Sequence, residues 1–161
     1  MNASSRFAVA VHILLVLHIN RMIRGFDATT SDFIAESVNT NAVVIRRILG
    51  MLRKAGLVVS QTGVGGGSSL AKSAEQISLE NIRVAVEDGP LFHPHYSEPS
   101  EECPIGHCIQ DEIGGAIDEA EAAVSKVFGG KSLAVLAEKM IQTDEFQTCM
   151  KEQMAEMELQ S

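Results

Sequence analysis

The sequence predicts a mostly α-helical fold with a small β-hairpin wing: a winged helix-turn-helix domain followed by a long dimerisation helix. Three observations predict it. Apolar residues recur at helical spacing along most of the chain, one glycine-rich hairpin follows the first three helical segments, and a long one-sided helix comes later. The 161 residues, 45% of them hydrophobic, suffice for one folded domain with an appended helical part.

The first helix is predicted over the apolar stretch from Phe7 to Ile19, with Ser4 or Ser5 as its cap. His12 and His18 interrupt this stretch, and it is shorter than the ~20 residues of a membrane span. We therefore expect a buried helix and no membrane segment.

The next two helices are short and joined by a tight turn. Thr30 or Ser31 can cap the first of them, which runs to Asn39. The second begins near Thr40 or Asn41, ends at the Ala55-Gly56 step, and carries one apolar face formed by Val44, Ile48, Met51 and Leu52. This arrangement predicts a helix-turn-helix.

A hairpin follows these helices. Leu57 to Val59 reads as a strand, a loop with four glycines between residues 63 and 67 comes next, and Ser69 to Ala71 reads as the second strand. A further short helix is predicted from Gln76 to Glu87. A hairpin directly after a helix-turn-helix predicts the winged variant of that motif.

The C-terminal half begins with a segment rich in Pro, His, Glu and Cys, typical of an exposed loop. A helix from Ile109 to Phe128 then carries an apolar stripe, whose dimerisation candidates are Ile109, Ile113, Ile117, Ala120 and Val124. Such a stripe in a short chain is best covered by a second copy, so we predict an isologous homodimer. Leu133 to Ile141 forms one more helix, and the tail beyond Glu145 continues it or frays. The predicted domains are 1–88 for DNA binding, 89–108 as a sensor-type loop, and 109–161 for dimerisation and the tail.

Charge is unevenly divided between the two halves. Residues 1–83 hold nine basic and five acidic side chains, whereas the remainder holds four basic and sixteen acidic ones, so the net charge of -8 hides a basic half. A basic half indicates a polyanionic partner. The odd count of three cysteines argues against a disulfide scaffold and favours a reducing, cytoplasmic location.

No catalytic motif competes with this interpretation, and we expect no enzyme. The chain has no nucleophile elbow, and its paired acids, Glu101-Glu102 and Asp111-Glu112, lie in acidic stretches typical of solvated surface. The glycine loop lacks the Gly-Lys-Ser/Thr end of a phosphate-binding loop.

Several motifs in this order resemble the Rrf-two (Rrf2) family of winged-helix regulators. They are Ile34 to Ser37, Val44 to Leu52, Lys54 to Val58, the glycine wing, and Ile77 to Leu79 leading to Ala85 to Glu87. Ser37 to Asn41 together with Cys103 to Gly106 is most similar to the YwnA-like branch of that family. The resemblance implies a homodimer that binds a pseudopalindromic double-stranded DNA operator and represses transcription.

The resemblance also implies which residues meet DNA: Asn39, Thr40, Asn41, Val43, Arg46 and Arg47 around the start of the recognition helix, with Gly65 and Gly66 in the wing. Physical chemistry supports the helix positions independently, because Asn can read adenine and Arg guanine in the major groove. Thr30 and Ser31 begin the preceding helix, where backbone donors can hold a phosphate. The wing carries Gln61, Thr62 and Ser68 where many family members have Arg and an aromatic residue.

Four interpretations of the loop cysteines stay open. Cys103 and Cys108, with His107 and the nearby His93 and His95, could ligate an iron-sulfur cluster or a zinc ion, although the third loop cysteine of the family's cluster-binding members is missing. The two thiols could instead form a redox-responsive disulfide, or be unreactive. We expect no cofactor. A different class of function, a winged-helix protein-interaction module without its own operator, would show binding that depends little on salt.

Overall fold

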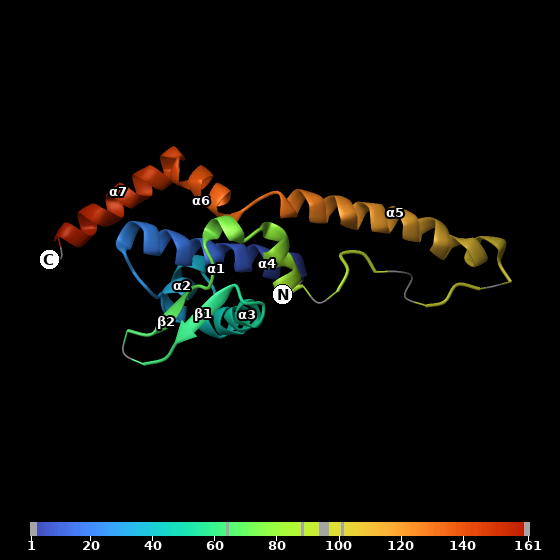
Figure 1. Ribbon diagram of the computed structural model, residues 1–161, viewed down its shortest axis with the longest axis horizontal. Coiled ribbons are helices and arrows are strands. Elements are labelled where there is room, and N and C mark those ends of the chain that lie inside the picture. The colour runs from blue at the N-terminus through green and yellow to red at the C-terminus, as the bar shows by residue number, and fades with distance from the viewer. Residues whose placement is uncertain (1–2, 64, 88, 94–96, 101, 160–161) are drawn as a thin grey trace.

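The computed structural model describes residues 3–63, 65–87, 89–93, 97–100 and 102–159. It is mostly helical with one small antiparallel sheet, as predicted (Figure 1). The elements are α1 (Ala3–Arg24), α2 (Ser31–Val38), α3 (Ala42–Lys54), β1 (Val58–Gln61), β2 (Gly67–Leu70), the 3₁₀ turn η1 (Ala74–Gln76), α4 (Leu79–Val86), α5 (Pro104–Gly129), α6 (Leu133–Ile141) and α7 (Asp144–Leu159).

Helix α1 is the central helix of the fold. Ala10, Ile13 and Leu14 on its apolar face are fully buried, and the helix contacts α2, α3, α4, α6 and β2. Residues Ser5–Arg24 are long and apolar enough to cross a membrane by length and composition. Because the buried face of α1 supplies much of the core, it serves here as a core helix.

The helix-turn-helix forms through three local caps. The Thr30 hydroxyl accepts a hydrogen bond from the Phe33 amide at the start of α2, and the Asn41 side chain accepts one from the Val43 amide at 2.8 Å at the start of α3. Between them Asn39 ends α2 in the left-handed conformation, with φ 53°, which asparagine tolerates better than most residues. These caps fix the tight turn that the sequence predicts.

Strands β1 and β2 form the wing, with Val58 opposite Leu70 and Gln61 opposite Gly67. Thr29, just before α2, pairs with Ser68 on the other side of β2. Side chains would not fit at two of the wing glycines. A Cβ on Gly66 would lie 2.5 Å from the Gln61 carbonyl oxygen, and one on Gly67 would lie 2.7 Å from that of Thr29.

The helix predicted from Gln76 to Glu87 is shorter than expected. Ser73 and Gln76 cap the 3₁₀ turn η1, and Ser78 with Asn81 caps a new helix, α4, that begins at Leu79. Two successive capping boxes satisfy the backbone amides locally, and this interrupts the helix between Gln76 and Leu79. The apolar spacing alone did not reveal that break.

The predicted loop 89–108 also ends earlier than expected, because α5 begins at Pro104. Cys103 is its N-cap residue and Pro104 occupies the first turn, where a proline lacks only an amide that has no partner there. Cys108 and His107 therefore lie on a helix. The 26 residues of α5 span about 39 Å and project away from the winged domain, with the preceding segment beside them (Figure 1).

Helix α6 belongs structurally with the first domain, although the sequence grouped it with the dimerisation part. Leu133 and Ala137 are fully buried in the common core. Backbone hydrogen bonds also link the start of α6 to the first domain: the Leu133 amide donates to the Ile77 carbonyl, and the Leu79 amide donates to the Lys131 carbonyl. We call residues 3–87 with α6 the head, and α5 the arm.

Candidate nucleic-acid interface

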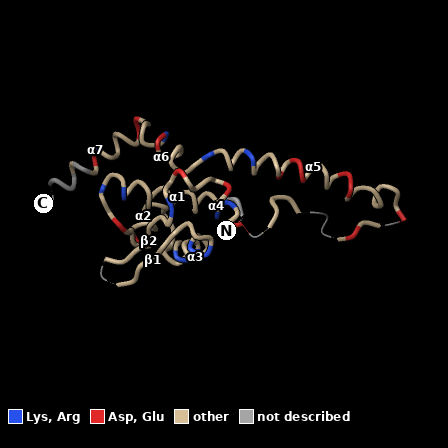
Figure 2. Tube along the Cα trace, in the orientation of Figure 1, with Lys and Arg blue, Asp and Glu red and all other residues tan. Residues whose placement is uncertain are grey.

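Helix α3 presents an exposed basic surface on the head. Its buried face consists of Ile45, Ile48, Leu49 and Leu52, so the opposite face points to solvent. Arg47, Arg53 and Lys54 are exposed on this helix, and Val43 at its start is 66% exposed. Figure 2 shows the basic residues gathered on α3 and acidic residues distributed along α5. The surface suits a polyanion, and Val43 suits an apolar contact such as a thymine methyl group.

Arg46 is tied to the start of α2. Its Nε donates to the Ser31 hydroxyl and its Nη2 to Asp32 Oδ1, each at 3.1 Å, and the ion pair with Asp32 is largely exposed to solvent. The two arginines that were predicted to read bases therefore differ in the contacts that their side chains make. Arg46 bridges the two helices, whereas no hydrogen bond or ion pair of Arg47 is found among the described residues.

The other residues around the turn that were predicted to contact DNA also stabilise the local fold, as helix caps or through hydrogen bonds. Asn39 and Asn41 are caps, and the Thr40 amide donates to the Ala35 carbonyl. Thr30 is also a cap, and Ser31 accepts from Arg46. Asn41 uses its oxygen for the cap, which leaves its amide nitrogen for another partner. Asn39, Thr40 and Asn41 form the turn before α3, and Ser31 is joined to α3 through Arg46.

Gly65 and Gly66 lie at the tip of the wing. Gly65 has φ +76°, and the Gly66 amide donates to the Gly63 carbonyl, so the chain turns back on itself here. Val64 lies outside the described residues. Among the described residues of the tip, Gly65 and Gly66 offer backbone groups only.

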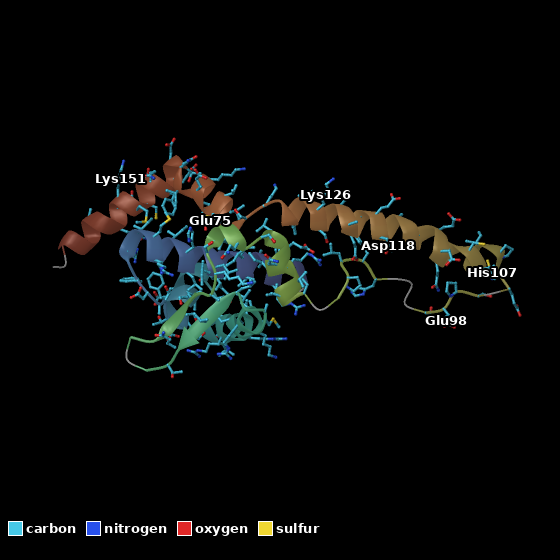
Figure 3. The ribbon with its side chains drawn as sticks, viewed as in Figure 1. Glu75, Glu98, His107, Asp118, Lys126 and Lys151 are labelled. Carbon is cyan, nitrogen blue, oxygen red and sulfur yellow. The ribbon has the colours of Figure 1, made fainter. Side chains whose placement is uncertain are left out.

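The sensor candidates lie on or next to the end of α5 that is farthest from the head. Cys103, Cys108 and His107 are exposed there, and Figure 3 places His107 at this far end. All three cysteines are free thiols. The backbone amides of Gly106 and Ile105 at the helix start lower the pKa of Cys103. His93 is exposed in the preceding segment, and His95 lies outside the described residues.

The dimerisation candidates on α5 divide into two groups. Ile109 and Ile113 are exposed, whereas Ile117, Ala120 and Val124 are half-buried, on the side nearer the preceding segment and α4. Leu91 and Phe92 of that segment are held by the Glu121 carboxylate, which accepts hydrogen bonds from both of their amides. No residue of α5 is fully buried.

Sequence reasoning missed two residues of these sites. Asp32 is the partner of Arg46, and Glu121 is the anchor of the loop. Asp32 is an acid in the first turn of a helix, and such an acid is usually explained by the helix dipole alone. Glu121 sits among other acids of α5, so nothing in the sequence singled it out.

The geometry of a capped turn, an exposed basic second helix and a glycine wing agrees with the comparison to known proteins. A family model described as an iron-dependent transcriptional regulator, Rrf2, matches residues 3–139. The chain belongs to the Rrf2 family. This Rrf2 protein is similar to the HTH-type transcriptional regulator YwnA of Bacillus subtilis, with 35% identity over 130 residues, which are 81% of this chain and 92% of the relative.

Solved structures support the same assignment for this Rrf2 chain. A structure described as a DNA-binding protein is 33% identical with a TM-score of 0.64, covering 81% of this chain and 97% of the other. The oxidised form of Staphylococcus aureus CymR is 25% identical with a TM-score of 0.60, covering 86% and 97%. The Rrf2 protein is a winged-helix DNA-binding transcriptional regulator and, like its relatives, not an enzyme.

The description of the family mentions iron, but we find no set of iron ligands in the part of this Rrf2 chain that the structure describes. No group of three or more His, Cys, Asp or Glu side chains there could hold a metal ion. Cys103 and Cys108 are separated by five positions along the start of α5, and spacing of that kind turns two side chains to different sides of a helix. Within one chain, the described residues therefore bring together fewer than three such ligands.

Proposed function

We propose that this Rrf2 protein is a homodimeric repressor that reads a two-fold symmetric operator with α3 of each protomer. The observation that carries the proposal is the solvent-facing start of α3, where an exposed Val43 lies next to the uncommitted Arg47. A recognition helix uses its N-terminal residues on base edges, and a free arginine can bind guanine with two hydrogen bonds. A dimer that covers a promoter in this way blocks transcription.

The neighbouring residues fit supporting contacts with the DNA backbone. Thr30 and Ser31 begin α2, and backbone amides at a helix start attract phosphate. Arg46 can exchange Asp32 for a phosphate without moving far. Gly65 and Gly66 allow the wing backbone to approach the sugar-phosphate chain closely, because glycine has no side chain.

We propose α5 as the dimer interface. Ile113 is 50% exposed and Val127 53% exposed, Ile109 of the same helix is exposed as well, and Leu91 and Phe92 are exposed in the segment that precedes α5. A contiguous exposed apolar surface on a regular helix is typical of an interface, and an isologous pair is its commonest form. An arm of this length also separates two heads, as reading two half-sites one helical turn apart requires.

A redox response is a second candidate property, favoured by the lowered pKa of Cys103. A thiol with a lowered pKa has a larger thiolate fraction and reacts faster with oxidants. In an antiparallel pair of arms, the start of one α5 would approach the head of the other protomer. Oxidation there could alter the relative position of the heads.

The free thiols and the DNA partner both favour the predicted cytoplasmic location.

The test begins with selection of the operator from a random DNA pool, followed by titration of the labelled operator over a range of salt concentrations. Arg47→Ala should weaken binding by about 1 to 3 kcal/mol and relax preference at one base position in each half-site. Lys151→Ala is the matched control, because it removes one positive charge from α7, on the far side of the head from α3 (Figure 3). Equal losses in the two variants, or selection of no common sequence, would contradict the proposal. In vitro transcription from a promoter carrying the operator then checks repression.

A further inference from the structure

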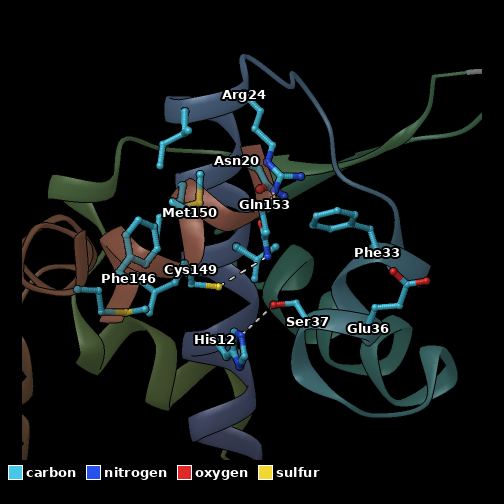
Figure 4. Close-up of a pocket in the computed structure, with 15 residues that line it drawn as sticks. His12, Asn20, Arg24, Phe33, Glu36, Ser37, Phe146, Cys149, Met150 and Gln153 are labelled. Atoms are coloured by element: carbon cyan, nitrogen blue, oxygen red, sulfur yellow. Dashed lines mark hydrogen bonds between the residues drawn. The ribbon is translucent and has the colours of Figure 1, made fainter. Parts of the chain in front are cut away.

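A cavity of about 570 Å³ lies between α1, α2 and α7 (Figure 4). Its volume is in the range that small-molecule sites occupy. Leu15, Val16 and Ile19 line it from α1, and Phe146 and Met150 line it from α7. Most of its wall is therefore apolar, as in sites that bind the body of a small organic ligand.

Asn20 supplies a polar group at this apolar wall. Its side chain is more than nine-tenths buried, with a relative exposure of 8%, and its Nδ2 has no hydrogen-bond partner in the described part of the molecule. A buried amide without a partner costs free energy on the order of 1 to 3 kcal/mol. Asn20 lines the cavity, so a turn of its amide toward an acceptor atom of a bound ligand would remove that cost.

Arg24 adds a positive charge one turn further along α1. Its Nη2 donates to Gln153 Oε1 at 2.9 Å, and its guanidinium carbon lies 5.7 Å from the centre of the Phe33 ring. The structure gives Arg24 no ion pair with any described residue. Since residues four apart share one helix face, Asn20 and Arg24 can donate to the same group.

The acidic residue at the cavity lies on another element. Glu36 is an exposed side chain of α2, on the other side of the Phe33 ring from Arg24 (Figure 4). The two donors on α1 therefore form one end of the site, and the apolar side chains of α1 and α7 form its body. This asymmetry matches a molecule with one anionic end and one apolar end.

We propose that the cavity binds a small carboxylate with an apolar body, and that its occupancy changes the affinity for the operator. Asn20 and Arg24 hold the carboxylate, and the side chains around Val16 and Phe146 cover the body. The second half of the proposal rests on the proposed function. Its physical basis is α2: Phe33, Glu36 and Ser37 form one wall, and the Ser37 hydroxyl is hydrogen-bonded to His12 Nε2 at 3.2 Å. A ligand between α7 and α2 would therefore act on the helix that packs against α3.

Binding is tested on the full chain with four carboxylates of different apolar bodies: phenylacetate, indole-3-acetate, 4-methylpentanoate and octanoate. Calorimetry and ligand-observed NMR should show saturable binding of at least one, with a Kd of about 1 mM or below. The amine and amide analogues of that compound should bind at least about tenfold more weakly, because they lack the negative charge. Absence of saturable binding by all four, or equal binding of the amine, would overturn the site.

Variants locate the ligand. Arg24→Gln and Asn20→Leu should each weaken binding at least about fivefold. Arg21→Gln on the same helix is the matched control, since Arg21 does not line the cavity. Val16→Phe fills the cavity and should abolish binding, with thermal melting used to check that each variant is folded. Cys149 lines the cavity and is exposed, so the bound carboxylate should slow its alkylation by iodoacetamide but not that of Cys108. Unchanged binding in folded Arg24→Gln would overturn the assignment of the anionic end.

Coupling is measured separately by titrating the operator with and without saturating carboxylate. We expect a change in affinity of at least about fivefold, in either direction, which is absent in Arg24→Gln. A carboxylate that binds but leaves operator affinity unchanged would overturn only the regulatory half. Failure to find any operator would overturn the proposed function, while calorimetry would still report on the cavity.

Discussion

The Ser125 hydroxyl donates a hydrogen bond of 2.9 Å to Glu80 Oε1, and this contact joins the arm α5 to α4 of the head. Glu80 is at the same time bound by Arg83, whose Nε and Nη2 reach its two oxygens at 2.8 and 2.6 Å. Near the same end of the arm, the rings of Phe7 and Phe128 are stacked with centroids 5.1 Å apart. The head is thus held to its arm by both polar and aromatic contacts, so the arm can set the separation of two heads in a dimer.

Ser125→Ala should lower the free energy of unfolding by about 1 kcal/mol, because it removes one hydrogen bond to a half-buried carboxylate. In a dimer, the variant head would also be held less firmly to its arm. Inserting one base pair between the two half-sites of the operator should therefore weaken binding of the variant less than it weakens binding of the wild type. Urea unfolding and operator titration measure these effects. Thr148→Ala on α7 serves as the control, and equal discrimination of operator spacing by Ser125→Ala and wild type would argue against a rigid connection.

Stability should fall in acid partly through Glu80. The hydrogen bond from Arg83 is the main cause that lowers the pKa of Glu80, and Ser125 adds to it. A group whose pKa is lower in the folded state binds fewer protons there, so its contribution is present above the ordinary value of 4.5 and is lost as pH falls through the lowered pKa. Glu80→Gln should therefore cost about 1 to 2 kcal/mol at neutral pH and progressively less below pH 4.5, in urea unfolding at several pH values. A constant difference across this range would be inconsistent with the predicted linkage.

Ile113→Asp should convert the proposed dimer into monomers, because the new carboxylate would be buried without a partner in the proposed interface. A substitution at Ile113 tests the interface more directly than one at Ile117. Ile117 is half-buried within its own chain, so its replacement would also disturb the fold. Ala122→Asp introduces the same charge on the opposite face of α5 and should leave the dimer intact. Sedimentation velocity distinguishes the two variants, and an intact dimer in Ile113→Asp would exclude this face.

Asp32→Asn should strengthen operator binding and steepen its salt dependence by about one unit. The change removes an acid from the proposed DNA interface and releases Arg46 to bind a phosphate. Arg46→Ala should have the opposite effect on both quantities. Titration of the operator between low and moderate salt measures the slopes, with Asp27→Asn as a control in the segment before α2. Weaker binding by Asp32→Asn would indicate that Asp32 serves mainly to orient Arg46.

Cys103 should be alkylated faster than Cys149 near neutral pH. The amides of Gly106 and Ile105 lower the pKa of Cys103, so a larger fraction of it is thiolate at a given pH, and the pH profile of its reaction should be shifted downward. Mass spectrometry after short exposure to iodoacetamide measures the rates. If the thiol also controls DNA binding, oxidation should change operator affinity in the wild type and in Cys149→Ser but not in Cys103→Ser or Cys108→Ser.

Local sequence features determined most of the head. Of the residues predicted to start the two helices, Thr30 rather than Ser31 and Asn41 rather than Thr40 are the caps, and the predicted hairpin follows them. These features depend on residues within a few positions of one another, so single side chains reveal them. The order of the family motifs and the basic character of residues 1–83 also predicted DNA binding from the sequence alone.

The tertiary structure decided what depends on distant residues. It paired Arg46 with Asp32, brought α6 into the core of the head, and placed α7 beside Asn20 as a second wall of the cavity. It also placed the start of α5 at Pro104, although the composition around Cys103 had predicted a longer loop. Sequence periodicity records which face of a helix is apolar, but not which distant element covers that face. The burial of Asn20 and the partner of Arg46 therefore became visible only when α1, α2, α3 and α7 were packed together.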